Sequence, residues 1–213
     1  MSGVFVYWDN SNIFIGAQQF AAARERSPGA RYLVRLEFDN LLRLAHADRP
    51  LVSATAVGPV PPELRRLWTL LENRGVTVKL CNRVDPEQGE QNMPDYVLQL
   101  GMLEDGFDYN GAPGTAVLLT GDGAGFYDGA GRRLHGMRRT MERLHKRGWK
   151  VEILSWGDSC NQRMRQWAEA NGVFVSLDDY YTAITFLEPS RPGFPLALPR
   201  DAAALDLARR PLA

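Results

Sequence analysis

The chain opens with the stretch GVFVYWDNSNIF (residues 3–14), an apolar run that ends abruptly in an aspartate and two asparagines. The run is short and rich in β-branched and aromatic residues, which is typical of a buried strand in a parallel sheet. A helix is expected to follow it, roughly over Ser11–Ala23. Two interpretations of Asp9 follow: it caps this helix, or it serves a ligand at the carboxyl edge of the sheet.

Apolar segments of strand length alternate with amphipathic helical segments along the rest of the chain. We expect strands at residues 51–57, 76–80, 115–120, 151–156 and, at an edge of the sheet, 173–176. We expect helices around residues 36–44, 64–71, 94–103, 134–144 and, with Ser159 as its N-cap, 159–170. The alternation predicts an α/β fold, a three-layer α/β/α sandwich around a central, mostly parallel sheet of five or six strands.

Length and composition favour one such domain. The chain has 213 residues, of which 45% are hydrophobic, enough for a sizeable core. We expect the domain over residues 1–186 and a proline-rich tail over 187–213. The two cysteines form no disulfide framework, and no signal peptide or membrane span is evident, so we expect a cytoplasmic protein.

The charges balance overall, with 25 basic and 25 acidic residues, but they are unevenly distributed. Residues 84–128 contain nine acidic residues and no Lys or Arg, whereas residues 131–167 contain ten basic residues against three acidic ones. Such a basic segment is usually only a solvated helix face. Beside an acidic site, however, it would suit a polyanionic substrate.

A second apolar strand ends in an aspartate, in the same way as the first. Residues 115–120 lead into the glycine-rich sequence GDGAGF (residues 121–126), which contains Asp122. A plain tight turn is the alternative. A third aspartate, Asp95, lies in the expected first turn of a helix. Asp9 and Asp122 would meet if their strands are neighbours, and clustered carboxylates favour Mg²⁺ or Mn²⁺.

Three short segments carry a resemblance to a known family. In order and spacing, residues 9–12 (DNSN), 94–96 (PDY) and 120–122 (TGD) resemble the NYN domain of the PIN-like ribonuclease superfamily, in its bacterial LabA-like/DUF88 branch. The resemblance extends over about residues 4–181. It implies a PIN-like, Rossmann-like sandwich and a metal-dependent ribonuclease that acts on RNA, with single-stranded RNA expected. It also implies metal ligands at Asp9, Asp95 and Asp122, and a hydrogen-bonding residue of the site at Asn12.

One departure from the family pattern leaves the function open. The family's usual Gly-Asp-Ser-Asp-Phe has two acids, whereas residues 121–126 have only Asp122. Asp128 is a candidate for the missing ligand, although a turn residue is the simpler interpretation. One alternative is therefore a non-catalytic module that binds RNA or a protein partner. The fold class alone suggests another, a small-molecule phosphoesterase that uses the same metal.

Basic and aromatic residues complete the set of candidates. Phosphate contacts are expected from the arginines of the basic segment, namely Arg132, Arg133, Arg138, Arg139, Arg163 and Arg165. Tyr7, Trp8 and Phe126 are candidates for stacking on bases, although aromatic residues at strand ends more often belong to the core. A homodimer is compatible with the sequence.

Overall fold

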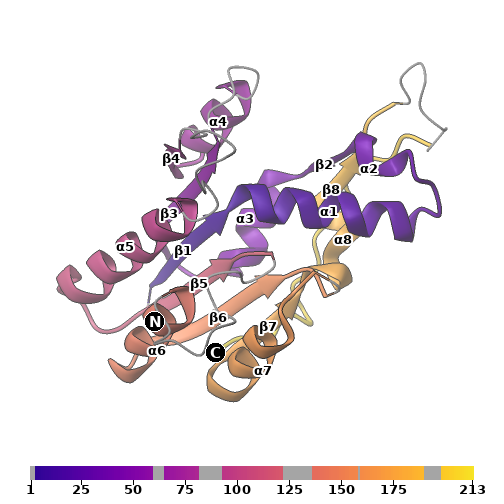
Figure 1. Ribbon diagram of the computed structural model, residues 1–213. Helices are drawn as coiled ribbons and strands as arrows, with labels where there is room; N and C mark the ends of the chain where they lie inside the picture. Colours follow the sequence, from indigo (N-terminus) through magenta and orange to yellow (C-terminus); the bar gives the residue numbers. More distant parts are fainter. Residues whose placement is uncertain (1–2, 60–64, 82–92, 122–135, 158, 190–197) are drawn as a thin grey trace, which may run out of the picture.

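The protein is an α/β/α sandwich (Figure 1). The computed structural model describes residues 3–59, 65–81, 93–121, 136–157, 159–189 and 198–213. The strands are β1 (Val4–Asp9), β2 (Val34–Leu36), β3 (Leu51–Pro59), β4 (Thr77–Cys81), β5 (Thr115–Leu119), β6 (Lys150–Ser155), β7 (Val173–Ser176) and β8 (Thr185–Leu187). The helices are α1 (Asn10–Arg24), α2 (Ala30–Leu33), α3 (Phe38–His46), α4 (Arg65–Glu72), α5 (Met93–Asp108), α6 (Met137–Lys146), α7 (Gln162–Asn171) and α8 (Tyr181–Ile184), with a 3₁₀ turn, η4, at Leu177–Tyr180.

The main sheet has six strands in the order β4-β3-β1-β5-β6-β7, and every neighbouring pair is parallel. This confirms the predicted fold class, including the place of residues 173–176 at an edge. The order reverses at β1, which pairs with β3 on one side and with β5 on the other. Trp8 pairs with Leu119 in the β1–β5 register, so the carboxyl ends of these two strands lie together.

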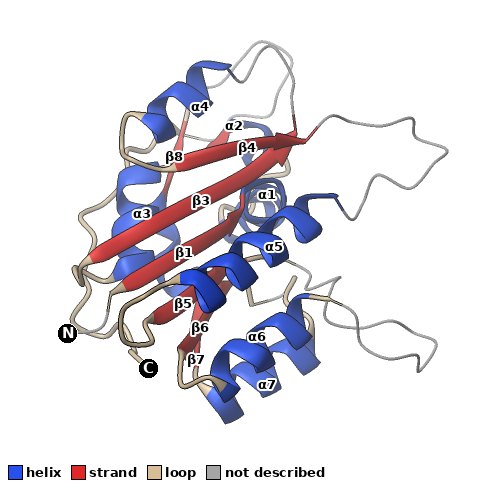
Figure 2. Ribbon diagram, turned by 90° about the vertical axis from the view of Figure 1, so that its left-hand side faces the viewer, coloured by secondary structure: helices blue, strands red, loops and turns tan. Residues whose placement is uncertain are grey.

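Helices cover both faces of this sheet because the side chains of β1 alternate between two cores. Val4, Val6 and Trp8 point into the core that α1, α3 and α4 cover. Phe5 and Tyr7 point into the core that α5, α6 and α7 cover. Figure 2 shows α5, α6 and α7 side by side on their face of the sheet.

Two local predictions were wrong. Leu36 belongs to β2, not to the helix expected from residue 36, because residues 34–36 pair antiparallel with β8 in a separate two-stranded sheet. Ser159 does not cap α7. The cap is Asn161, whose side chain accepts hydrogen bonds from the backbone N–H groups of Arg163 and Met164, and α7 begins at Gln162.

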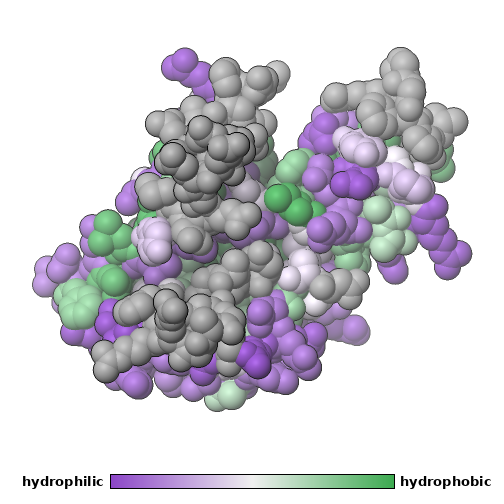
Figure 3. All heavy atoms as spheres, in the orientation of Figure 1, coloured by the Kyte–Doolittle hydropathy of each residue, from purple (hydrophilic) through white to green (hydrophobic). Residues whose placement is uncertain are grey.

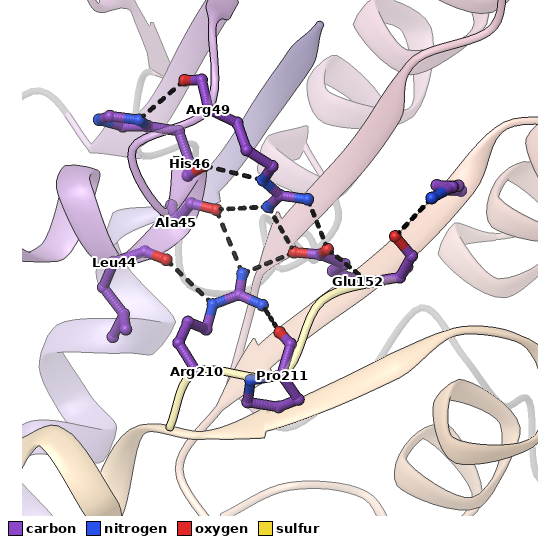
Figure 4. A network of polar contacts seen from close by, with 9 residues as sticks. Leu44, Ala45, His46, Arg49, Glu152, Arg210 and Pro211 are labelled. Atoms are coloured by element: carbon purple, nitrogen blue, oxygen red, sulfur yellow. Dashed lines mark hydrogen bonds and ion pairs between the residues drawn. The ribbon is translucent and has the colours of Figure 1, made fainter. Parts of the chain in front are cut away.

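The last described segment, residues 198–213, packs on the domain through a buried charge network (Figure 4). Arg210, 6% exposed, donates to the Glu152 carboxylate at 2.6 Å and to the backbone oxygens of Leu44 and Ala45 at the end of α3. Arg49 approaches the same carboxylate at 2.7 and 2.8 Å. This segment therefore contacts the core through Glu152 of β6. The boundary expected at residue 186 stays a prediction.

Candidate functional site

Asp9 ends β1 and caps α1. Its Oδ1 accepts the backbone N–H of Asn12 at 3.0 Å, and its Oδ2 accepts the Asn12 side-chain amide at 2.7 Å. The Asp9 side chain is almost buried, with the residue 4% exposed. The capping interpretation is thus confirmed. Capping and ligand binding are compatible, because a carboxylate has about four acceptor sites.

The end of β5 meets the start of α1 at Gly121. A Cβ on Gly121 would lie 2.9 Å from the Asn12 Cβ and 3.1 Å from its carbonyl oxygen, so only glycine allows this approach. Two buried hydrogen bonds hold the ends of β5, β6 and α1 together: Ser155 Oγ donates to the Gly121 oxygen, and Trp156 Nε1 donates to the Ile13 oxygen, both at 2.9 Å. The carboxyl edge beside Asp9 is therefore tightly built.

Asp95 lies in the first turn of α5, on the side of the sheet to which Asp9 points. Leu98 and Met102, which follow Asp95 at helical spacing, pack in the same core as Tyr7. Tyr7 and Asp9 share a face of β1 because they are two residues apart. Further along α5, Asp105 accepts a hydrogen bond from the Tyr7 hydroxyl at 2.7 Å. Burial and this carboxylate raise the Tyr7 pKa, so the phenol stays a donor.

The structure brings Asp9 and Asn12 together and places Asp95 in the helix layer on the same side of the sheet. Asp122 and Asp128 lie outside the described residues, as do Arg132, Arg133 and Phe126. Within the described part of the chain, no three His, Cys, Asp or Glu side chains form a group that could hold a metal ion.

Comparison of the sequence with protein-family models identifies the family of this chain. The model of the NYN domain matches residues 3–184. The chain belongs to the NYN domain family. No curated protein matches the sequence significantly, and neither does any solved structure.

The NYN domain has a PIN-like, nuclease-type fold, and the parallel six-stranded sandwich described above agrees with it. It is an RNA-related domain, and NYN/PIN-like nucleases generally use a divalent metal. Asp9 and Asn12 carry carboxylate and amide oxygens, the ligand types that Mg²⁺ and Mn²⁺ prefer, but the described residues do not complete a metal-binding group. None of the helices in the described ranges is long and apolar enough to cross a membrane.

Four of the predicted RNA-binding arginines lie in the first turns of two helices of this NYN domain. Arg138 and Arg139 are in α6, whereas Arg163 and Arg165 are in α7. Both helices follow strands of the parallel sheet, so their first turns lie at its carboxyl edge. Arg138 pairs with Glu142 at 2.8 Å, and Arg165 pairs with Glu169 at 2.9 Å. Phosphate binding by these arginines stays a prediction.

Two of the candidates for base stacking belong to the core. Tyr7 and Trp8 are at most 1% exposed, so they are core residues and not stacking platforms.

The structure also draws attention to Asp178 and Asn10, to which the sequence assigned no role. Asp178 accepts a hydrogen bond from the Gly157 backbone N–H at 3.0 Å, which places it just beyond the end of β6. Asn10 was part of the polar run after β1 without a role of its own. It is 94% buried, and the local sequence contains no signal for that burial.

Proposed function

We propose that this NYN domain is a divalent-metal-dependent ribonuclease of the LabA-like/DUF88 branch that hydrolyses phosphodiester bonds in single-stranded RNA. The observation that carries the proposal is the position of Asp9. Its carboxylate is held in one orientation at the switch point of the sheet, beside the end of β5 that leads to Asp122. Ligands bind at this place in open α/β sheets.

Asp9, Asp95 and Asp122 would hold Mg²⁺ or Mn²⁺, and Asp128 is the candidate for an additional ligand. When bound, such an ion supplies activation of water and stabilisation of phosphate charge. The protein orients the carboxylate that would bind this ion. Asn12 donates to both Asp9 oxygens and so limits rotation of the carboxylate. The arginines in the first turns of α6 and α7, together with Arg132 and Arg133, would hold the RNA phosphates on the side of α5, α6 and α7.

One observation favours a second function. The sequence after β5 has Asp122 but lacks the second acid of the family pattern. A domain with fewer ligands would bind RNA or a protein partner without cutting. The two functions differ in one measurable property, metal-dependent cleavage.

Cleavage of a labelled single-stranded RNA in Mn²⁺ or Mg²⁺ tests the proposal. We expect the wild-type protein to cut, EDTA to stop cleavage, and Asp9→Asn and Asp95→Asn each to lower the rate at least about 100-fold. Asparagine is as good an N-cap as aspartate, so Asp9→Asn retains the cap of α1. Loss of cleavage would then report on the carboxylate and not on folding.

Asp108→Asn is the matched control, because Asp108 is exposed at the opposite end of α5. It should cut like wild type. Equal cleavage by wild type and Asp9→Asn would overturn the ribonuclease proposal. RNA binding without cleavage would favour the non-catalytic function, and activity confined to small phosphoesters would favour a phosphoesterase.

A further inference from the structure

A cavity of about 640 Å³ includes Asn10, the residue after Asp9, in its lining and lies on the face of the sheet to which Val6 and Trp8 point. Residues of α1, α2, β2, α3, α4 and β8 line it, among them Asn10, Phe14, Tyr32, Phe38, Leu67 and Phe186. Figure 3 shows the surface hollowed between α4 and the α1–α2 side, with hydrophobic residues on the wall. The cavity is large enough for a nucleoside-sized group.

Asn10 is the lining residue whose side-chain oxygen is unsatisfied in the described part of the chain. Asn10 is 6% exposed, and its Oδ1 is buried without a hydrogen bond among the described residues. A buried carbonyl oxygen without a hydrogen bond destabilises a fold, so its presence suggests a ligand group that donates to it. A side-chain amide offers both a donor and an acceptor, as the edge of a nucleobase does.

The walls of the cavity are suited to a flat ring. Four aromatic side chains line it, and Tyr32 is 48% exposed at the surface. Aromatic side chains are the usual stacking partners of unpaired bases.

The charges of the cavity favour a neutral ligand. Among the described lining residues, Arg35 and Arg74 are balanced by Glu37 and Glu188. Arg35 also pairs with Glu188 at 2.8 Å, and Arg74 forms an ion pair with Asp39 of α3. A phosphate would have to compete with these carboxylates, whereas an uncharged base would not.

We propose that this cavity receives an unpaired base of the RNA strand whose phosphate lies at the Asp9 edge. Asp9 and Asn10 are consecutive and serve opposite faces of the sheet, one the acidic site and the other the cavity. The proposal requires one nucleotide to extend from the Asp9 edge into the cavity beside Asn10. The inference rests on the proposed function only in taking RNA as the ligand.

RNA-binding measurements under conditions without cleavage test the inference about the cavity. Fluorescein-labelled RNA octamers of A, C or U, and an octamer of abasic ribonucleotides, are titrated in EDTA and followed by fluorescence anisotropy. We expect wild type to bind at least one base-containing octamer about tenfold more tightly than the abasic one. Asn10→Ala and Tyr32→Ala should each reduce this preference at least about fivefold, with binding of the abasic octamer unchanged.

The controls are Asn110→Ala and Phe107→Ala, which remove an exposed amide and an exposed aromatic ring at the far end of α5. They should keep the wild-type preference. Asn10→Ala should also unfold at a temperature no lower than wild type, because it removes a buried Oδ1 that makes no hydrogen bond among the described residues.

Three results would overturn the inference. They are equal binding of base-containing and abasic octamers, retention of the preference in both cavity variants, and tighter binding of free mononucleotides than of the octamers, which would assign the cavity to a free nucleotide. The proposed function fails separately. If wild type shows the base preference but cuts no RNA with Mn²⁺, the inference about the base cavity is supported and the ribonuclease proposal is wrong.

Discussion

At the scale of single residues, the Asp9–Asn12 pair links folding to the proposed chemistry. The backbone N–H of Asn12 makes the helix cap, whereas its side-chain amide only orients the carboxylate, at 2.7 Å from Oδ2. Asn12→Ala should therefore lower RNA cleavage about 10- to 100-fold and raise the metal concentration needed, as loss of an orienting partner does. Cleavage rates measured across a Mn²⁺ titration check this prediction.

Asn171→Ala is the corresponding control, because the Asn171 amide donates to a backbone oxygen within α7. Its cleavage rate and metal dependence should match wild type. If Asn12→Ala cut RNA at the wild-type rate across the Mn²⁺ titration, Asn12 would not be needed to orient the Asp9 carboxylate.

At the scale of elements, the contact between β5 and α1 depends on Gly121. Adding a methyl group there places it 2.9 Å from the Asn12 Cβ and 3.1 Å from the backbone oxygen of the same residue, so one element must move. Gly121→Ala should lower the free energy of unfolding by about 1–3 kcal/mol, the usual cost of overpacking. Gly121→Ala should also slow RNA cleavage, because the added methyl group would displace Asn12, which orients the Asp9 carboxylate. Urea denaturation and the RNA assay measure the two effects.

Gly101→Ala serves as the comparison within α5. A Cβ at Gly101 would meet nothing within 4 Å, and alanine favours a helix over glycine by about 0.5–1 kcal/mol. This variant should be as stable as wild type or slightly more so. If the two glycine variants unfolded at the same urea concentration, the close contact at Gly121 would not limit stability.

At the scale of the whole molecule, Glu152 joins β6, the end of α3 and the last described segment. Burial alone would raise the pKa of Glu152, but Arg49 and Arg210 outweigh burial and lower it. Glu152→Gln leaves these two guanidinium groups without their shared carboxylate, and should reduce the free energy of unfolding by about 3–5 kcal/mol at pH 7. Chemical denaturation at several pH values checks this prediction.

The pH dependence has a defined sign. Because the folded state lowers this pKa, the stabilisation is complete above the unfolded value, about 4.3, and is lost as pH falls through the folded value. The gap between wild type and Glu152→Gln should therefore close in acid. Glu169→Gln, which breaks an exposed pair in α7, should cost less than about 1 kcal/mol. A gap that stays constant down to the acid range would contradict the role of the Glu152 charge.

Much of the main sheet could be predicted because each of its strands is a local apolar run. The run before Asp9 and the run before Gly121 are buried neighbours, as expected. The small β2–β8 sheet could not be predicted, because it pairs three-residue segments about 150 residues apart that carry no periodicity. The N-cap of α7 was misplaced by two residues because several polar residues before the helix are suitable caps.

The sequence by itself determined the alternation of strands and helices and the position of Asp9 at a strand end, since both follow from local side-chain patterns. Only the tertiary structure decided what lies beside them. Asn10 faces an aromatic cavity, and Glu152 meets Arg49 and Arg210, because residues distant in the sequence pack there. Burial and charge pairing depend on those neighbours, and a local pattern contains no information about them.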